Sequence, residues 1–324
     1  MNSVDPSEAG AQPGTAGRGP SSGRRFARLA LGVVAGLLLV FAALIALLLV
    51  DANILRKPIA SYVSHTLDRP FAINGDLRIR LFRHPRIEVD EVVLGNAAWG
   101  SRPVMAKVER AIIGVRLLPL LHGRIELPQV ELTRPDVILE RNVEGKANWR
   151  FGEAAPSKAD VGANPPTIDA LWIKGGKLVF RDPGAQTDVA LAFDSDRSVG
   201  DAKAMLEFKG TGSLRDNEFK LSGRAASLLE LTQAGKPYKL DVTASAGATR
   251  ASFDGTLVPL RLESIDGKLQ LSGKDLAALY PIIPVPLPWT PPYDISGRFK
   301  RDGAKYTLSD LRGRVGSSDV HGKV

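Results

Sequence analysis

The 324-residue sequence contains no cysteine, which excludes disulfide scaffolds, thiolate metal sites, cysteine nucleophiles and CxxC redox motifs. Aromatic residues are scarce at 6%, and no run of five like charges occurs, although the formal net charge is +8. Surfaces that bind nucleic acid usually cluster basic residues and interleave them with aromatic ones. The fine alternation of basic and acidic residues therefore argues against a nucleic-acid partner.

Motifs of common enzyme classes are also missing. The sequence holds no GxSxG, P-loop, GxGxxG or HExxH motif, and its four histidines are scattered without metal-ligand spacing. Acidic neighbours such as Asp90-Glu91 project to opposite faces of a strand. The DxD of residues 194–196 lacks further ligands at a suitable spacing and is typical of a solvated turn. We therefore expect no enzymatic activity, no cofactor and no metal site.

One long apolar segment stands out from this background. Residues 29–50 contain nine Leu, four Val, one Ile and one Phe, and no charge, amide or proline. As a helix this segment would be about 33 Å long, enough to cross the hydrocarbon core of a bilayer. A cleaved signal peptide is the main alternative, but its apolar core usually runs about 7–15 residues. We expect an uncleaved transmembrane helix.

The flanks of this segment predict its orientation. Arg24, Arg25 and Arg28 lie within six residues on its N-terminal side, which favours a cytoplasmic N-terminus. Residues 1–28 are rich in Gly, Ser, Pro and Ala, which predicts a disordered cytoplasmic tail. The larger part of the chain is then expected on the opposite side of the membrane.

After residue 50 the spacing of apolar residues changes. Leu55, Ile59, Val63 and Leu67 recur every four positions and predict a short amphipathic helix. From residue 71 the period is two, which predicts strands with one buried and one wet face. Such strands are expected over residues 76–81, 86–94, 107–117, 124–132, 137–141, 171–181, 188–195, 203–214, 218–224, 239–246, 249–257, 260–272 and 294–308.

The spacing of these strands predicts an all-β organisation, because short runs separated by Gly, Pro and Asn turns favour neighbouring antiparallel strands. Pro128 lies inside one run, which predicts an edge strand or a bulge there. Residues 152–167 are rich in Ala, Pro, Gly and Asp without periodicity and predict a linker. The expected β-rich regions are therefore residues 51–151 and 168–324.

A faint internal repeat lies in the second region. Residues 219–223 (FKLSG) precede residues 227–231 (SLLEL), and residues 269–273 (LQLSG) precede residues 275–279 (DLAAL). Each copy predicts a strand that ends at Gly, a cap residue and one helical turn. A repeated strand unit favours an elongated sheet to which further units can be added.

Several short segments, taken in their order along the chain, resemble the motifs of a known protein family. They are residues 69–77, 92–96, 117–123, 135–142, 144–149, 173–182 and 313–322. With this order the chain resembles the AsmA family of Gram-negative envelope proteins, from about Leu29 to its end. Residues 144–149 match the family's Asp/Glu-Gly-x-x-Asn-Trp pattern, and the first part resembles the chorein-type start of bridge-like lipid transfer proteins. Family members continue past this point, so we expect the C-terminal β-repeat region to be incomplete.

The resemblance implies a mainly β fold: a transmembrane helix and a short amphipathic helix, followed by an elongated, curved, mostly antiparallel sheet that forms a groove or half-barrel. It further implies an anchor in the inner membrane, a periplasmic body and a role in outer-membrane biogenesis. The partners implied are phospholipid, the inner membrane and outer-membrane or periplasmic assembly proteins.

Apolar residues of the alternating runs are the candidates for lining a lipid groove. They are Leu77, Ile79, Leu81, Val89, Ile113, Val115, Ile125, Leu127, Val137 and Leu139. The same residues would line the dry core of a β-sandwich, and alternation alone does not distinguish the two. Two functions remain open: a protein that binds or transfers phospholipid along a groove, and a non-catalytic scaffold that assists outer-membrane protein assembly through exposed edge strands.

Overall fold

The structure is a computed structural model. It describes residues 51–81, 84–120, 122–151, 167–195, 204–231, 235–258, 261–279 and 288–322. Contacts divide the chain into two units, Met1–Val50 and Asp51–Val324. The expected cytoplasmic tail and transmembrane helix, residues 1–28 and 29–50, lie outside the described residues. In the part that is described, no helix combines the length and the apolar composition that a membrane span requires.

Helical segments are few and short in the described part of the chain. They are η1 (Ala52–Leu55), α2 (Arg56–Leu67), α3 (Leu117–Leu120), α4 (Leu228–Leu231) and η2 (Leu276–Leu279). The predicted amphipathic helix is confirmed as η1 and α2. Ala52 and Leu55 pack with Leu77 and Val89. The start of this helical segment therefore covers one face of the first strands.

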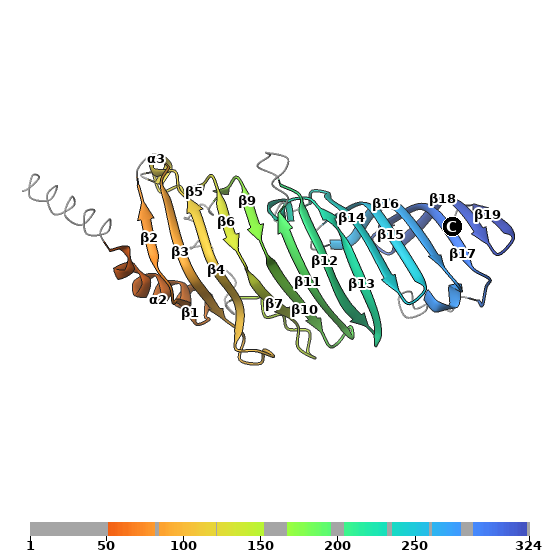
Figure 1. Ribbon diagram of the computed structural model, residues 1–324, viewed down its shortest axis with the longest axis horizontal. Coiled ribbons are helices and arrows are strands. Elements are labelled where there is room, and N and C mark those ends of the chain that lie inside the picture. Colours follow the sequence, from red (N-terminus) through yellow and green to blue (C-terminus); the bar gives the residue numbers. More distant parts are fainter. Residues whose placement is uncertain are drawn as a thin grey trace, which may run out of the picture. The chain divides into compact units, whose positions relative to one another are not determined.

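The other described elements form a long, curved sheet of 17 strands (Figure 1). The first strands are β1 (Phe71–Ile73), β2 (Leu77–Arg80), β3 (Arg86–Gly95), β4 (Val104–Gly114), β6 (Val130–Thr133), β7 (Asp136–Glu140), β9 (Leu171–Lys174) and β10 (Gly176–Asp182). The later strands are β11 (Thr187–Ser195), β12 (Leu206–Leu214), β13 (Asn217–Ala225), β14 (Tyr238–Ala246), β15 (Thr249–Val258), β16 (Arg261–Gly273), β17 (Tyr293–Asp302), β18 (Lys305–Val315) and β19 (Ser318–Gly322). Two short strands, β5 (Glu126–Leu127) and β8 (Thr167–Ile168), pair separately.

Most strand pairs are antiparallel, as predicted. From β10 to β19 each strand pairs with the next one along the chain. At the N-terminal end, β1 and β2 pair with the two halves of β3. Figure 1 shows β2 and β19 at opposite ends of the sheet, which is not closed. The expected mainly β fold with a curved, antiparallel sheet is thus confirmed.

One parallel crossover interrupts the antiparallel order. β6 and β7 both pair with β4, and β9 and β10 run parallel to β6 and β7. Parallel neighbours require a long connection, which here includes residues 152–166. These residues lie outside the described part, whereas Thr167, the last residue of the predicted linker, lies in β8. A single sheet therefore continues on both sides of the predicted linker.

Three predicted strand runs are each divided in two, and a fourth ends three residues early. The run 171–181 is two strands, β9 and β10, which are separated at Gly175, whose φ is +66°. The run 294–308 is two strands, because a turn at Gly303, whose φ is +60°, reverses the chain between β17 and β18. The run 107–117 ends at Gly114, and Leu117 begins α3. The run 124–132 is divided into β5 and β6 around Pro128, which has no backbone N–H for the ladder.

Polar side chains of the helical segment protect the first edge of the sheet. Asn53 Oδ1 accepts a hydrogen bond of 2.9 Å from the backbone N–H of Leu77. Ser64 Oγ accepts one of 2.9 Å from the backbone N–H of Phe71. Edge strands otherwise present such groups to other chains. The segment from η1 to α2 therefore both packs on the sheet and caps its edge.

A buried polar cluster fixes the end of β7. Asn148 is fully buried, and its side-chain amide donates to Asn96 Oδ1 and to the carbonyl of Ile138, both at 3.0 Å. Asn148 Oδ1 accepts from the backbone N–H of Glu140 at 3.0 Å. The Glu140 carboxylate accepts from Asn96 Nδ2 at 2.6 Å and from the backbone N–H of Ser101 at 3.0 Å. Each of these buried groups thus has a partner.

The internal repeat is confirmed in both copies, except that β13 continues past Gly223 and ends at Ala225. β13 leads to α4, and β16 leads to η2. The side chains of Ser227 and Asp275 each accept a hydrogen bond from a backbone N–H of the following helical turn. Each copy is followed, after a proline, by a buried tyrosine that begins the next strand, Tyr238 or Tyr293.

Candidate functional site

The candidate site is the apolar face of the sheet, which can be followed from strand to strand through the pairing. Residues directly opposite each other on neighbouring strands project to the same face. Leu77 is opposite Val89, and Ile79 is opposite Ile87, which in turn is opposite Ile113. The structure therefore brings four of the predicted lining residues together on one face: Leu77, Ile79, Val89 and Ile113.

This first part of the face is covered. Leu77 is 2% exposed and Val89 is 7% exposed, because η1 packs against them. Ile79 belongs to the same group of packed side chains. At the N-terminal end, these residues therefore form a small core beneath the helical segment.

Two further predicted residues, Val137 and Leu139, lie where the longer part of the face begins. Val137 is opposite Leu178 and Leu139 is opposite Phe180, in the parallel pair of β7 and β10. Val137 and Leu139 are half-buried. They connect the first strands to a stretch of apolar side chains that continues to β19.

The other four predicted residues lie outside the strands of the large sheet. Leu81 follows β2, Val115 follows β4, and Leu127 lies in β5 of the two-stranded sheet. Ile125 precedes β5 and is 42% exposed. The structure does not bring these four together with the other six, because β2 ends at Arg80, β4 ends at Gly114, and β5 pairs with β8 in the separate sheet.

The longer part of the face has an uninterrupted apolar row that the sequence reasoning did not single out. We call the following residues, which are opposite one another on successive strands, the central row: Leu178, Leu191, Gly210, Leu221, Ala244, Ala251, Leu271, Ile295, Gly313 and Val320. Every member is aliphatic or glycine. The period-two pattern of each strand indicates which of its residues are on the apolar face. Only the register between neighbouring strands shows that these residues form one row.

Aromatic side chains flank the central row on the same face. They are Phe180, Phe193, Phe208, Phe219, Phe253, Tyr293 and Phe299. Several of them lie over glycines of the neighbouring strand. A Cβ on Gly176 would lie 2.6 Å from the ring of Phe193, and one on Gly212 would lie 2.6 Å from the ring of Phe219. Glycine in these strands therefore provides the room in which the rings lie close to the sheet.

The central row is half-buried, and no second layer formed by described elements lies over it. Apart from neighbouring strands, the principal packing partners in the described ranges are α2 with β1 and η1 with β2. Where β12 and β14 begin, α4 packs beside Leu206 and Tyr238 through Leu228 and Leu231. The described elements thus leave most of the apolar face without a covering sheet or long helix.

A small apolar cavity of about 210 Å³ lies on this face. Its lining includes Ala244 and Ala251 of the central row, with Leu214 and Phe219 at its side. The two alanines leave space that the larger side chains around them do not fill. This cavity is of a size and polarity that suits part of a hydrocarbon chain.

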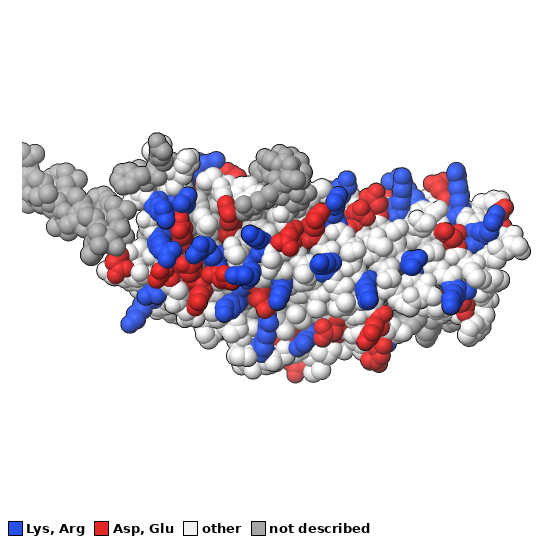
Figure 2. Space-filling view, viewed as in Figure 1, with Lys and Arg blue, Asp and Glu red and all other residues white. Residues whose placement is uncertain are grey.

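The opposite face of the sheet is polar and carries paired charges. Figure 2 shows cationic and anionic side chains interleaved across it. Arg78 pairs with Asp76 at 2.6 Å, and Arg80 pairs with Glu88 at 3.1 Å. Both arginines are exposed and paired with carboxylates, as is typical of a solvated face.

Two ion pairs on this face shift the pKa of a carboxyl group. The hydrogen bond from Arg134 lowers the pKa of Glu109, and the hydrogen bond of 2.8 Å from Arg298 lowers the pKa of Asp266. Both carboxylates are thus stabilised in their charged form. Such pairs are typical of a solvated surface.

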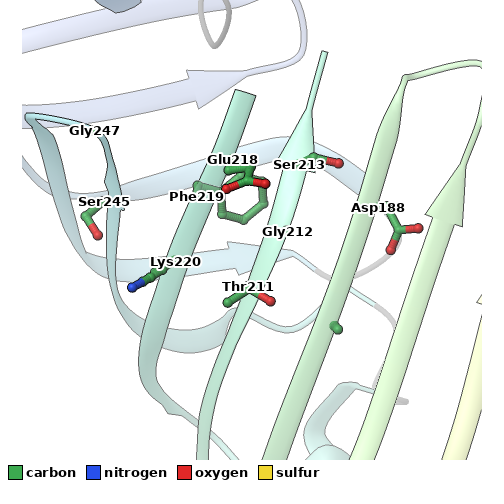
Figure 3. A pocket seen from close by; sticks show the side chains of 10 residues that line it. Asp188, Thr211, Gly212, Ser213, Glu218, Phe219, Lys220, Ser245 and Gly247 are labelled. Atoms are coloured by element: carbon green, nitrogen blue, oxygen red, sulfur yellow. The ribbon is translucent and has the colours of Figure 1, made fainter. Parts of the chain in front are cut away.

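A polar hollow of about 690 Å³ lies across β11 to β14 (Figure 3). Asp188, Thr211, Glu218 and Lys220 are among its lining residues. Within the described ranges, no three His, Asp or Glu side chains lie close enough together to hold a metal ion. Asp194 of the DxD lies at the end of β11, not in a turn, where it accepts a hydrogen bond from the backbone N–H of Gly175.

Comparison with known proteins places these observations in a family. The sequence model of the AsmA family matches residues 24–170. The AsmA family protein YhjG of Escherichia coli (strain K12) is 29% identical over 326 aligned positions, covering 89% of this chain. Both matches support membership of the chain in the AsmA family. The resemblance drawn from the motifs is thereby confirmed.

The AsmA family match covers the first strands of the sheet but not the central row. The family model ends at residue 170, before β9, whereas the central row begins in β10. The chain spans about half the length of YhjG, 48% of it. No solved structure matches the chain.

Proposed function

We propose that this AsmA family protein is anchored in the inner membrane by residues 29–50 and holds phospholipid acyl chains on the apolar face of a periplasmic sheet. In this proposal it contributes to outer-membrane biogenesis by binding or transferring phospholipid. The protein acts by binding and not by catalysis. The family membership supports an envelope-associated role. The apolar face of the sheet supports an acyl chain as the ligand.

The central row is the observation that carries the proposal. It presents aliphatic side chains, alanines and glycines from β10 to β19 without a polar interruption. Neighbouring strands lie about 4.8 Å apart, so the row offers a continuous apolar path across the strands. A hydrocarbon chain that lies along this path is shielded from water without any polar group having to be desolvated.

The energetic argument follows from burial. Each methylene group that leaves water for an apolar surface gains about 0.8 kcal/mol when it is fully buried. The rings of Phe208 and Phe219 flank the row and increase the area that an acyl chain contacts. The headgroup remains in water beyond the sheet, so the proposal needs no cationic site on the apolar face.

Site-specific photocrosslinking in cells tests this proposal. Leu191 lies in the central row of β11, and its neighbour Ala192 is exposed on the polar face of the same strand. Ile79 is less suitable because it packs under the helical segment. A photoreactive residue at Leu191, but not at Ala192, is expected to form adducts that contain phospholipid.

Two results would contradict the proposal. Absence of lipid adducts at both positions would indicate that the apolar face is covered in the complete protein. Protein adducts from Leu191 in place of lipid would favour the scaffold that assists outer-membrane protein assembly. Mass spectrometry of the adducts distinguishes these results.

A further inference from the structure

A second apolar surface lies at the turn that contains α3, away from the central row. Leu117, Leu118 and Leu120 are 39%, 76% and 45% exposed, and Ile125 is 42% exposed. We call these four residues the apolar tip. Large aliphatic side chains that gather on one exposed turn usually mark a surface that contacts another phase or molecule.

The apolar tip is an ordered feature of the fold. The backbone N–H of Gly123 donates to the carbonyl of Leu120, and that of Arg124 donates to the carbonyl of Pro119, both at 3.0 Å. At the base of the turn, Arg116 pairs with Asp169 at 2.9 Å. These hydrogen bonds and this ion pair fix the backbone of the turn, and its leucine side chains are exposed to solvent.

A cationic side chain accompanies the apolar tip, because Arg124 is exposed on the same turn. A hollow of about 670 Å³ borders the tip, and its lining includes Leu117 and Leu118 together with charges of both signs, Arg86 and Glu131. Exposed aliphatic side chains beside basic groups are the composition of segments that lie in the interface of an anionic membrane.

We propose that the apolar tip inserts into the headgroup region of the membrane that residues 29–50 are proposed to cross. The inference rests on the proposed function for the identity of that membrane. It adds a second contact, through which Leu118 enters the acyl boundary and Arg124 meets lipid phosphates. Projecting side chains can enter a fluid bilayer, whereas a folded protein partner would have to supply a groove that fits them.

The absence of cysteine makes a direct test possible, because one introduced cysteine is the only labelling site. The full chain carrying Leu118→Cys is labelled with an environment-sensitive NBD fluorophore and reconstituted in vesicles of phosphatidylethanolamine and phosphatidylglycerol. Val143→Cys is the matched control, since Val143 is an apolar residue that is 84% exposed on another turn. The expected result is a blue-shifted emission at Leu118→Cys that brominated lipid quenches, with neither effect at Val143→Cys.

Two outcomes would overturn the inference. An emission at Leu118→Cys that matches the control would show that the tip stays in water. A blue shift that brominated lipid does not quench would show that a protein, such as a second copy of the chain, covers the tip.

The test is separable from that of the proposed function. Lipid adducts at Leu191 together with a water-exposed Leu118→Cys would overturn only the inference about the tip. A quenched Leu118→Cys without lipid adducts at Leu191 would overturn only the proposed binding of lipid to the sheet.

Discussion

The side-chain amide of Asn148 donates a hydrogen bond of 3.0 Å to Asn96 Oδ1, although the two residues are 52 positions apart. Asn96 directly follows β3, and Asn148 follows the hairpin after β7. Both residues belong to motifs that carry the family resemblance. Their contact indicates that the two motifs form one structural unit at the ends of β3 and β7.

Asn148→Ala is expected to destabilise the protein strongly. The substitution removes the side-chain partner of the Glu140 N–H and of the Ile138 carbonyl in a buried place. Asn96 Oδ1 loses one bond and keeps the one from the backbone N–H of Ala97. Unsatisfied buried groups of this kind cost about 1–3 kcal/mol each, so a loss of about 3 kcal/mol or more in the free energy of unfolding is expected. Chemical denaturation measures this loss.

Asn142→Ala is the control for that prediction. Asn142 Oδ1 accepts from the N–H groups of Glu144 and Lys146 in the same hairpin, but at an exposed position. Water can replace these bonds, so the expected loss is about 1 kcal/mol or less. Equal losses for Asn142→Ala and Asn148→Ala would refute the structural role given to the buried cluster.

Gly176→Ala is expected to destabilise the sheet through its contact with one ring. The three nearest atoms to a Cβ on Gly176 all belong to Phe193, at 2.6–2.9 Å. Overpacking of this kind costs about 1–3 kcal/mol. In a Phe193→Leu background the smaller side chain can move aside, so most of this penalty should disappear.

A double-mutant cycle of these two substitutions, measured by denaturant unfolding, gives the interaction between them. If Gly176→Ala lowers the free energy of unfolding by the same amount with and without the Phe193 ring, contact with that ring is not what requires glycine at position 176.

Asn53→Ala is expected to open the first edge of the sheet. Without Asn53 Oδ1, the N–H of Leu77 loses its 2.9 Å acceptor. Hydrogen exchange of the Leu77 amide should become faster, because local opening of this edge then costs less free energy. The Val320 amide in β19 serves as the internal control and should keep its rate. Unchanged exchange at Leu77 would show that Asn53 does not protect the edge.

Tyr238 is expected to make stability depend on pH in the alkaline range. Burial raises the pKa of Tyr238 from about 10 to about 12, and its hydroxyl donates a 2.6 Å hydrogen bond to the carbonyl of Ala226. Because the folded pKa lies above the unfolded one, this contribution is fully present below pH 10 and is lost as the pH rises toward 12.

Comparison with Tyr238→Phe isolates this effect. Denaturant unfolding between pH 9 and pH 12 should show a steeper loss of stability for the wild-type protein than for the variant. Parallel curves for the two proteins would contradict the burial of the Tyr238 hydroxyl.

The sequence predicted the β-rich fold because each strand carries its own local signal. Alternation around Leu77 and Ile79 is enough to identify a strand and its apolar face. The turn at Gly303 was missed, because alternation continues on both sides of it and hides the reversal. The parallel pairing of β7 with β10 could not be predicted either, since it depends on contacts between distant residues.

The candidate site was predicted only in part for the same reason. Val137 and Leu139 were identified from alternation, but the central row depends on the register of many strands. Gly210 and Gly313 of that row carry no apolar side chain and gave no signal by themselves. Ile125 followed the alternating pattern, yet it lies on an exposed turn, because Pro128 separates it from the ladder of the large sheet.

Lipid binding by matched variants tests the central claim most directly. Ala251 lies in the central row beside the 210 Å³ cavity, and Ser252 follows it on the polar face. The full chain is purified gently, and the phospholipid bound to it is counted by native mass spectrometry for the wild type, Ala251→Asp and Ser252→Asp. Our account predicts bound phospholipid in the wild type and Ser252→Asp and a marked loss in Ala251→Asp, because a charge in the row must be desolvated when lipid binds. Equal amounts of lipid in all three proteins, or none in any, would contradict it.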